Sequence, residues 1–200
     1  MQEIEAKYYV RDLKNIEICL QELGAHLIQP RVLETNIRFD LPDASLRSEG
    51  RVLRLRQDTE TRLTYKSPSI RAQGVSNRTE IEFVVEDFEK AKLFLEALGY
   101  RKLLQYDKYR TTYSFTNSHV MLDELPYGNF VEIEGEDVAA IHAVSDKLKL
   151  NINNSISASY SALFERLRQT LELPFTDLTF VNFERINISP EHLHVEPADE

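Results

Sequence analysis

Charged residues of like sign recur two positions apart in segments that otherwise alternate between apolar and polar residues. In the first segment, Glu3 and Glu5 alternate with Ile4 and Ala6. Because successive side chains of a β-strand point to opposite faces, residues i and i+2 share one face and lie about 6–7 Å apart. Paired carboxylates at that distance repel each other unless a cation lies between them or their pKa rises. The pattern predicts a sheet with one apolar face and one strongly charged face.

Thirteen charged side chains occupy the polar faces of these segments. The acidic members are Glu3, Glu5, Glu80, Glu82, Asp123, Glu132 and Glu134. The basic members are Lys7, Arg54, Arg56, Lys66, Lys108 and Arg110. For any single pair, a solvated outer face is the simpler interpretation. Because acidic and basic pairs are distributed over at least six strands, they favour one shared polar interior, whose charges sum to −1 before any metal ion binds.

The spacing of apolar residues predicts an α+β fold. Strands are predicted over residues 2–10, 25–40, 51–57, 61–67, 77–85, 100–115, 118–125 and 129–136. Amphipathic helices are predicted over residues 11–24, 87–99, 137–150 and about 158–171. Eight antiparallel strands suffice to close a β-barrel and remove its exposed edges. The charged faces then line the lumen, and the helices pack outside on an apolar surface made of Leu53, Leu55, Ile81, Phe83, Val131 and Ile133.

The composition indicates one ordinary soluble domain. We expect residues 1–175 to form a single tunnel domain and residues 176–200 to form a partly flexible acidic extension. No apolar run reaches the roughly 20 residues that a membrane helix requires, and the first residues lack a signal-peptide core. Cys19 is the only cysteine, which excludes disulfide frameworks and favours a cytoplasmic location.

The net charge of −9 argues against nucleic acid as a partner. A lumen lined by both signs nevertheless suits a complex of a metal ion with a polyphosphate. Mg²⁺ and Mn²⁺ prefer carboxylate oxygens, whereas arginine binds phosphate oxygens in a bidentate manner. The sequence has no glycine-rich phosphate loop and no Gly-x-Ser-x-Gly motif. We therefore predict that the lumen holds a small polyphosphate-bearing molecule together with a metal ion.

Several motifs resemble those of the CYTH superfamily, the triphosphate tunnel metalloenzymes. The segment from Glu3 to Lys7 resembles the family's ExExK signature. Further matches follow in order up to about residue 165, including the segments 51–56, 78–82 and 130–134, and 159–164 resembles the closing helix of the family. Arg38 departs from the pattern, because many relatives carry an aromatic residue at this position near the expected tunnel mouth.

The resemblance implies an eight-stranded antiparallel tunnel, a small triphosphate-containing molecule as the partner, and roles for individual residues. Glu3, Glu5 and Glu134 would hold a first, activating Mg²⁺ or Mn²⁺ ion, and Asp123 and Glu132 would contribute to a second metal site. The phosphates would be bound by Lys7, Arg54, Arg56, Lys66, Lys108 and Arg110. Glu80 and Glu82 match acids on the tunnel wall that contact metal-bound water or orient the basic residues of the substrate site. The catalytic set is then Glu3, Glu5, Lys7 and Glu134.

Three functions remain open from the sequence. The first is metal-dependent hydrolysis of inorganic triphosphate, thiamine triphosphate or a nucleoside triphosphate. The second is a class IV adenylyl cyclase, which converts ATP to cyclic AMP and pyrophosphate. The third is a non-catalytic protein that binds polyphosphate-bearing ligands. Hydrolysis is favoured, because it asks less of the site than cyclisation does. A homodimer is expected by analogy with other small barrels.

Overall fold

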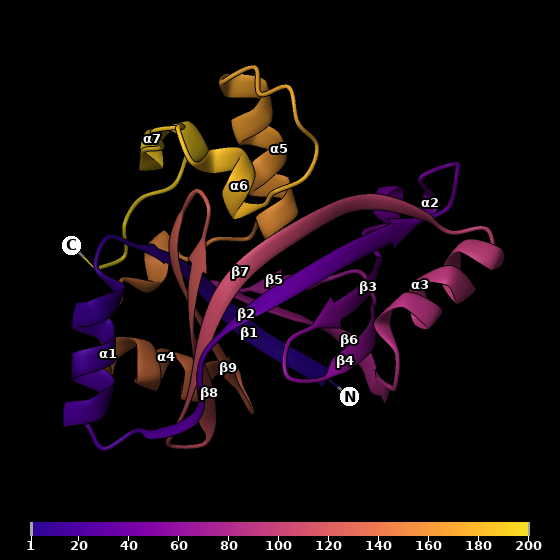
Figure 1. The fold of residues 1–200 in the computed structure, drawn as a ribbon. Coiled ribbons are helices and arrows are strands. Elements are labelled where there is room, and N and C mark those ends of the chain that lie inside the picture. The colour runs from indigo at the N-terminus through magenta and orange to yellow at the C-terminus, as the bar shows by residue number, and fades with distance from the viewer. Residues whose placement is uncertain (1, 200) are drawn as a thin grey trace.

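The computed structural model describes residues 2–199, which form one closed antiparallel β-barrel with an additional strand (Figure 1). The strands are β1 (Gln2–Val10), β2 (His26–Asp40), β3 (Val52–Gln57), β4 (Thr61–Lys66), β5 (Ile70–Ala72), β6 (Val75–Val85), β7 (Arg101–Phe115), β8 (Ser118–Leu125) and β9 (Gly128–Gly135). Their order is β1-β9-β8-β7-β2-β3-β4-β6-β5, and β1 also pairs with β6, which closes the barrel. The predicted eight-stranded barrel is confirmed. Only the short β5 lies outside the prediction; it pairs with β6 alone.

The pairing register decides which side chains meet inside the barrel. Glu5 lies opposite Glu134, and Lys7 lies opposite Glu132, in the pair formed by β1 and β9. Glu3 lies opposite Arg78 in the pair formed by β1 and β6. Because side chains alternate along each strand, these pairs place charged residues together on the inner face. The long-range register thus assembles the charge pairs that the local sequence pattern only suggests.

Helices connect and cover the strands. They are α1 (Leu13–Glu22), α2 (Ser45–Ser48), α3 (Phe88–Ala97), α4 (Val138–Lys147), α5 (Tyr160–Thr170), α6 (Phe180–Phe183) and α7 (Pro190–Leu193). A 3₁₀ turn covers Ile152–Asn154. The four predicted helices correspond to α1, α3, α4 and α5. The helices α1, α3 and α4 each begin after an aspartate, Asp12, Asp87 or Asp137, whose side chain accepts a hydrogen bond from a backbone amide of the first turn.

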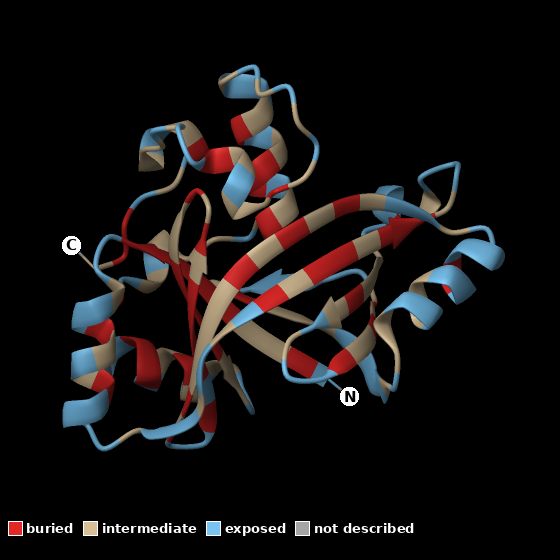
Figure 2. Cartoon of the chain, viewed as in Figure 1, coloured by how far each residue is buried: buried red, intermediate tan, exposed pale blue. Residues whose placement is uncertain are grey.

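The largest outer core lies where α1 and α4 cover β1, β8 and β9 (Figures 1 and 2). Ile16 and Leu20 of α1, together with Ile141 of α4, pack there against Val131 and Ile133. Fully burying a side chain of this size contributes roughly 1.5–3 kcal/mol. The predicted apolar outer face is therefore confirmed for these strands, and it fixes the opposite, charged face inside the barrel.

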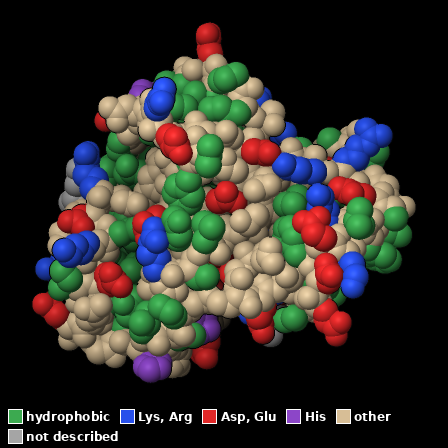
Figure 3. Space-filling view, in the orientation of Figure 1, with side chains coloured by type: hydrophobic (Ala, Val, Ile, Leu, Met, Phe, Trp, Pro, Cys, Tyr) green, Lys and Arg blue, Asp and Glu red, His purple; other side chains and the backbone are tan. Residues whose placement is uncertain are grey.

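The prediction that helices also cover Ile81 and Phe83 is wrong. These two β6 side chains are 54% and 53% exposed. The helix α3 has ten residues and buries Leu95 against Phe39 and Leu55, so it covers β2 and β3 and leaves β6 open. Figure 3 shows that hydrophobic side chains also lie at the surface of the molecule among charged ones.

The helix α5 and the segment after it cover one side of the barrel interior (Figure 1). The rings of Tyr160 and Phe130 lie 5.1 Å apart, and Leu178, Phe183 and Leu193 are buried in the same cluster. The predicted division at residue 175 stays a prediction. Within residues 2–199, no helix is both long and apolar enough to cross a bilayer.

Candidate functional site

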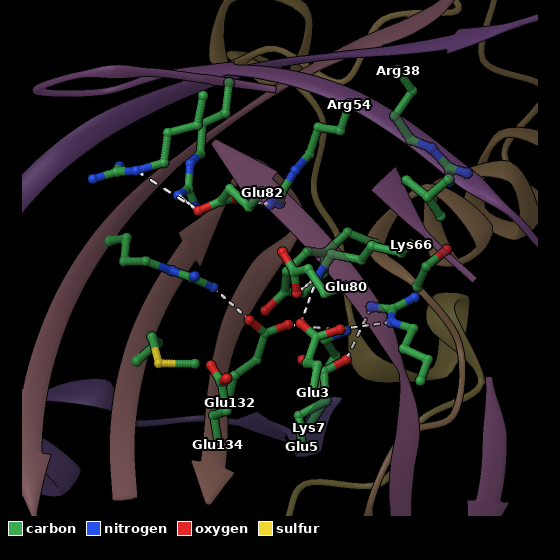
Figure 4. Close-up of a pocket in the computed structure, with 18 of the residues that line it drawn as sticks. Glu3, Glu5, Lys7, Arg38, Arg54, Lys66, Glu80, Glu82, Glu132 and Glu134 are labelled. Atoms are coloured by element: carbon green, nitrogen blue, oxygen red, sulfur yellow. Dashed lines mark hydrogen bonds and ion pairs between the residues drawn. The ribbon is translucent and has the colours of Figure 1, made fainter. Parts of the chain in front are cut away.

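The inner faces of the barrel enclose a cavity of about 680 Å³, within the usual range for small-molecule sites (Figure 4). Twelve of the thirteen predicted site residues line it. These are Glu3, Glu5, Lys7, Arg54, Arg56, Lys66, Glu80, Glu82, Lys108, Arg110, Glu132 and Glu134. They come from β1, β3, β4, β6, β7 and β9, so the site forms only when the barrel closes.

One part of the cavity wall is acidic. Glu5 and Glu134 are direct neighbours across the β1–β9 pair. The nearest cation of Glu5 is Arg78, whose Nη2 lies 3.4 Å from its Oε1. Within the described residues, Glu134 has no hydrogen bond and no ion pair. Burial, followed by the negative charges of Glu3 and Glu5, raises the pKa of Glu134. A cation bound beside Glu134 would therefore stabilise its ionised carboxylate.

Glu3 lies next to this acidic pair but is already neutralised. Arg78 Nε lies 2.7 Å from Glu3 Oε2, and Lys66 Nζ hydrogen-bonds Glu3 Oε1. Although burial opposes ionisation, these two cations lower the pKa of Glu3 to about 2. Lys66 also lies 3.1 Å from Glu80, whose pKa is raised by burial and by the charge of Glu3. Lys66 thus lies within ion-pair distance of both carboxylates. The ionised form of Glu80 is stabilised less than that of Glu3.

Asp123 is placed differently from the other predicted residues. It is 0% exposed and does not line the cavity. Lys108 Nζ lies 2.9 Å from its Oδ2, Tyr160 Oη donates to the same oxygen at 2.7 Å, and Arg110 Nε donates to Oδ1 at 2.6 Å. Both carboxylate oxygens are therefore engaged behind the cavity wall. The arrangement positions the lysine and the arginine, and a metal-binding role for Asp123 stays a prediction.

Glu132 connects the acidic wall to the basic one. Its Oε1 lies 3.0 Å from Lys7 Nζ, and its Oε2 contacts Arg110 Nη2. Burial alone would raise the pKa of Glu132, but Lys7 and Arg110 lower it well below its usual value. Glu132 is therefore held ionised between two cations that also face the cavity.

The sequence alone assigns no site role to four charged residues of the interior. Arg38, Arg62 and Arg78 line the cavity, and Glu34 lies buried behind it. Strand alternation could have found Arg78, which shares the inner face of β6 with Glu80, and Arg38, which shares that of β2 with Glu34. Arg38 and Arg78 do not belong to like-signed pairs two positions apart, the pattern from which the other site residues are predicted.

The three added arginines, together with the absence of Asp123 from the lining, reverse the predicted sign of the lining. Nine cationic side chains and six carboxylates of the described chain face the cavity, which gives +3 instead of the predicted −1. Two of the arginines are disfavoured as cations by this environment. Burial and the adjacent Arg54 lower the pKa of Arg56, and burial with the charges of Arg54 and Arg78 lowers the pKa of Arg38. The cavity therefore favours a polyanion electrostatically.

The acidic wall suits a divalent metal ion by the chemistry of its donors. In the described part of the chain, no group of three or more Asp, Glu, His or Cys side chains is arranged to hold a metal ion. Glu3 and Glu132 are paired with cations of the protein. Glu134 has no such partner, and Glu5 has only the 3.4 Å contact with Arg78. These two carboxylates, with Glu3 beside them, fit Mg²⁺ or Mn²⁺, which bind through one or two carboxylates and retain water.

Comparison with known proteins agrees with this geometry. The CYTH domain matches residues 1–159. Adenylate cyclase CyaB of Aeromonas hydrophila is 31% identical over 136 residues, which cover 66% of this chain and 67% of that protein. The solved structure of the PH1819 protein from Pyrococcus horikoshii OT3 is 27% identical with a TM-score of 0.66, and covers 82% of this chain and 98% of that one. HpAC1 from Hippeastrum is 19% identical with a TM-score of 0.63, and covers 82% and 95%.

The barrel, the charged lumen and these similarities lead to one conclusion about identity. The domain match extends over more than half of the chain and includes the strands that line the cavity, up to the start of α5. The chain belongs to the CYTH domain family.

Proposed function

We propose that this protein is a divalent-metal-dependent triphosphatase that cleaves inorganic triphosphate, thiamine triphosphate or a nucleoside triphosphate within the barrel. The observation that supports this most is the contrast between the two walls. Glu134 has no cation partner among the described residues and lies beside Glu5, whereas nine cations face the same cavity. Such a site can hold a polyanion together with its metal ion.

The barrel places the two kinds of group opposite each other. In the ring of eight strands, β3 lies four strands from β9 in either direction. Arg54 and Arg56 of β3 therefore lie across the lumen from Glu134 of β9. Figure 4 shows Arg54 and Glu134 on opposite sides of the labelled group. A triphosphate between them meets guanidinium groups on one side and the carboxylate pair on the other. In this proposal the arginines orient the phosphate chain and neutralise the charge that develops in the transition state.

Other side chains keep this arrangement fixed. Glu132 and Asp123 hold Lys7, Lys108 and Arg110 in place through the contacts described above, so these cations need little reorganisation when substrate binds. Glu5 and Glu134 would hold Mg²⁺ or Mn²⁺, which supplies charge neutralisation of the phosphates and activation of the attacking water when bound. The proposal includes a cytoplasmic location and a homodimer, both of which stay predictions.

A class IV adenylyl cyclase is the second candidate, because a relative of 31% identity bears the name adenylate cyclase CyaB. In that reaction the ribose 3′-hydroxyl attacks the α-phosphate, and pyrophosphate leaves. We favour the hydrolase because the structure of HpAC1 is described with a dominant triphosphatase activity, although that protein is also named an adenylyl cyclase.

Product analysis separates the candidates. Purified protein is incubated with inorganic triphosphate, thiamine triphosphate and ATP, each with Mg²⁺ or Mn²⁺, and the products are resolved by ³¹P NMR and chromatography. We expect release of orthophosphate from at least one substrate. Cyclic AMP together with pyrophosphate, without orthophosphate from any substrate, would replace the hydrolase by the cyclase. Binding without turnover of all three substrates would leave only the non-catalytic function.

A further inference from the structure

A second cavity, of about 550 Å³, adjoins the one inside the barrel. We call it the vestibule; it is lined by α2, by the beginning of β3 and by the first turns of α5. The side chains of Arg38, Arg78, Ser159 and Ser161 line both cavities, as does Val52. A chain-like ligand that leaves the barrel past Arg38 and Arg78 therefore enters the vestibule directly.

The vestibule is strongly basic. Its lining within residues 2–199 contains one carboxylate, Glu165, and six arginines, which are Arg38, Arg47, Arg51, Arg78, Arg166 and Arg168. Three of the arginines have carboxylate partners: Arg51 pairs with Glu49 at 2.7 Å, Arg168 with Glu165 at 3.3 Å, and Arg78 with Glu3 at 2.7 Å. In the described chain, Arg38, Arg47 and Arg166 have no ion pair.

Arg38 carries the strongest indication that an anion belongs here. Its Nη1 hydrogen-bonds Ser161 Oγ at 2.5 Å, and its Nε is buried without a hydrogen-bond partner in the described structure. Figure 4 places Arg38 at the edge of the labelled group, away from Glu5 and Glu134. A mostly buried guanidinium that lacks a counter-ion is costly, because its desolvation is not repaid. Burial and the charges of Arg54, Arg78 and Arg47 lower its pKa accordingly.

We propose that the vestibule binds the further phosphoryl groups of a linear polyphosphate of four or more phosphates whose other end lies in the barrel. This inference rests on the proposed function, because it assumes that the barrel holds the first three phosphates. A nucleoside at this position would place an uncharged base and sugar among six arginines that face one carboxylate. Each additional phosphoryl group instead adds negative charge and oxygen acceptors for guanidinium groups.

Equilibrium binding tests the inference without requiring turnover. Calorimetry in EDTA at constant ionic strength compares inorganic triphosphate, inorganic tetraphosphate and ATP on the full chain. We expect tetraphosphate to bind at least about tenfold tighter than triphosphate. In the double variant Arg47→Gln and Arg166→Gln, this ratio should fall to within about twofold of unity. Both arginines are exposed and have no described ion pair, so their replacement leaves the packing intact.

A matched control separates local contacts from the general effect of lost positive charge. Arg185 and Lys149 are exposed and line neither cavity. The double variant Arg185→Gln and Lys149→Gln removes the same charge, and we expect it to keep the tenfold ratio. If the first double variant does not fold by circular dichroism, Arg166→Gln alone is used, with Arg185→Gln as its control.

The inference would be overturned if the wild-type chain bound triphosphate and tetraphosphate with equal affinity. It would also be overturned if the affinity ratio of tetraphosphate to triphosphate fell equally in the two double variants. A third contradicting result is tighter binding of ATP than of triphosphate that only the Arg47/Arg166 variant abolishes. The last result would assign the vestibule to a nucleoside. Failure of the proposed function looks different, because the wild-type chain would then bind tetraphosphate tightly but release no orthophosphate from triphosphate with metal.

Discussion

Replacing Glu34 by Gln tests whether the buried interior acts as a network of ion pairs. Glu34 is 2% exposed on β2. Lys108 Nζ lies 3.4 Å from its Oε2, and Arg110 Nε and Arg56 Nη1 each lie 3.8 Å from its Oε1. Glutamine keeps the size of the side chain but removes its charge. Three buried cations then lose a shared anion in a cavity that already has an excess of positive charge.

The expected cost follows from the pKa of Glu34. Burial would raise this pKa, but Lys108 and Arg110 lower it from 4.5 to about 2. Because one pKa unit corresponds to about 1.4 kcal/mol, the ionised carboxylate contributes about 3 kcal/mol to the free energy of unfolding at pH 7. A carboxyl group whose pKa is lowered by folding stabilises the protein above its unfolded pKa. That contribution is lost as the pH falls from about 4.5 to about 2, and less than half of it remains at about pH 3.

Urea unfolding followed by circular dichroism measures this difference, since urea does not screen charges. Glu22→Gln is the control, because Glu22 is exposed at the end of α1. We expect Glu34→Gln to be destabilised by about 3 kcal/mol at pH 7 and by less than half of that at about pH 3. A difference below about 0.5 kcal/mol at pH 7, comparable to an ordinary surface substitution, would refute the reasoning, as would an equal difference at both pH values.

Two further predictions concern the function itself. Arg56→Ala removes a guanidinium from the wall opposite Glu134. We expect a higher KM for triphosphate and a lower kcat, each changed by about tenfold or more. Steady-state kinetics in which neither KM nor kcat changes would remove Arg56 from the substrate site. Because the pKa of Glu134 is raised by burial and by Glu3 and Glu5, protons should compete with the metal ion, and the Mg²⁺ concentration for half-maximal activity should rise as the pH falls from 7 to 5. An unchanged Mg²⁺ requirement over that range would contradict this role of Glu134.

The barrel and most of its lining could be predicted from the sequence, because both depend on local alternation. Glu3, Glu5 and Lys7 must share one face of a strand whatever the rest of the chain does. Once the apolar faces are assigned to the outside of the barrel, the paired charges on the opposite faces must point into the lumen. This is why twelve of the thirteen predicted residues line the cavity.

The remaining features depend on contacts between distant segments. Asp123 has the same alternation as the other acids, but Lys108 and Tyr160, from β7 and α5, engage it behind the wall. Arg38 and Arg78 belong to no like-signed pair, and their importance depends on which strands close the barrel. The exposure of Phe83 likewise depends on where α3 packs, which no periodicity within β6 reveals.

The central proposal is tested most directly by measuring whether triphosphate hydrolysis requires a divalent metal ion and Glu134. Orthophosphate release from inorganic triphosphate is measured over a Mg²⁺ titration for the wild-type chain, Glu134→Gln and, as a control, Glu22→Gln. We expect no release in EDTA, saturable activation of the wild-type chain and of the control, and a loss of at least about 10²-fold in Glu134→Gln with its fold intact. Normal turnover by Glu134→Gln, or full activity of the wild-type chain in EDTA, would contradict the account.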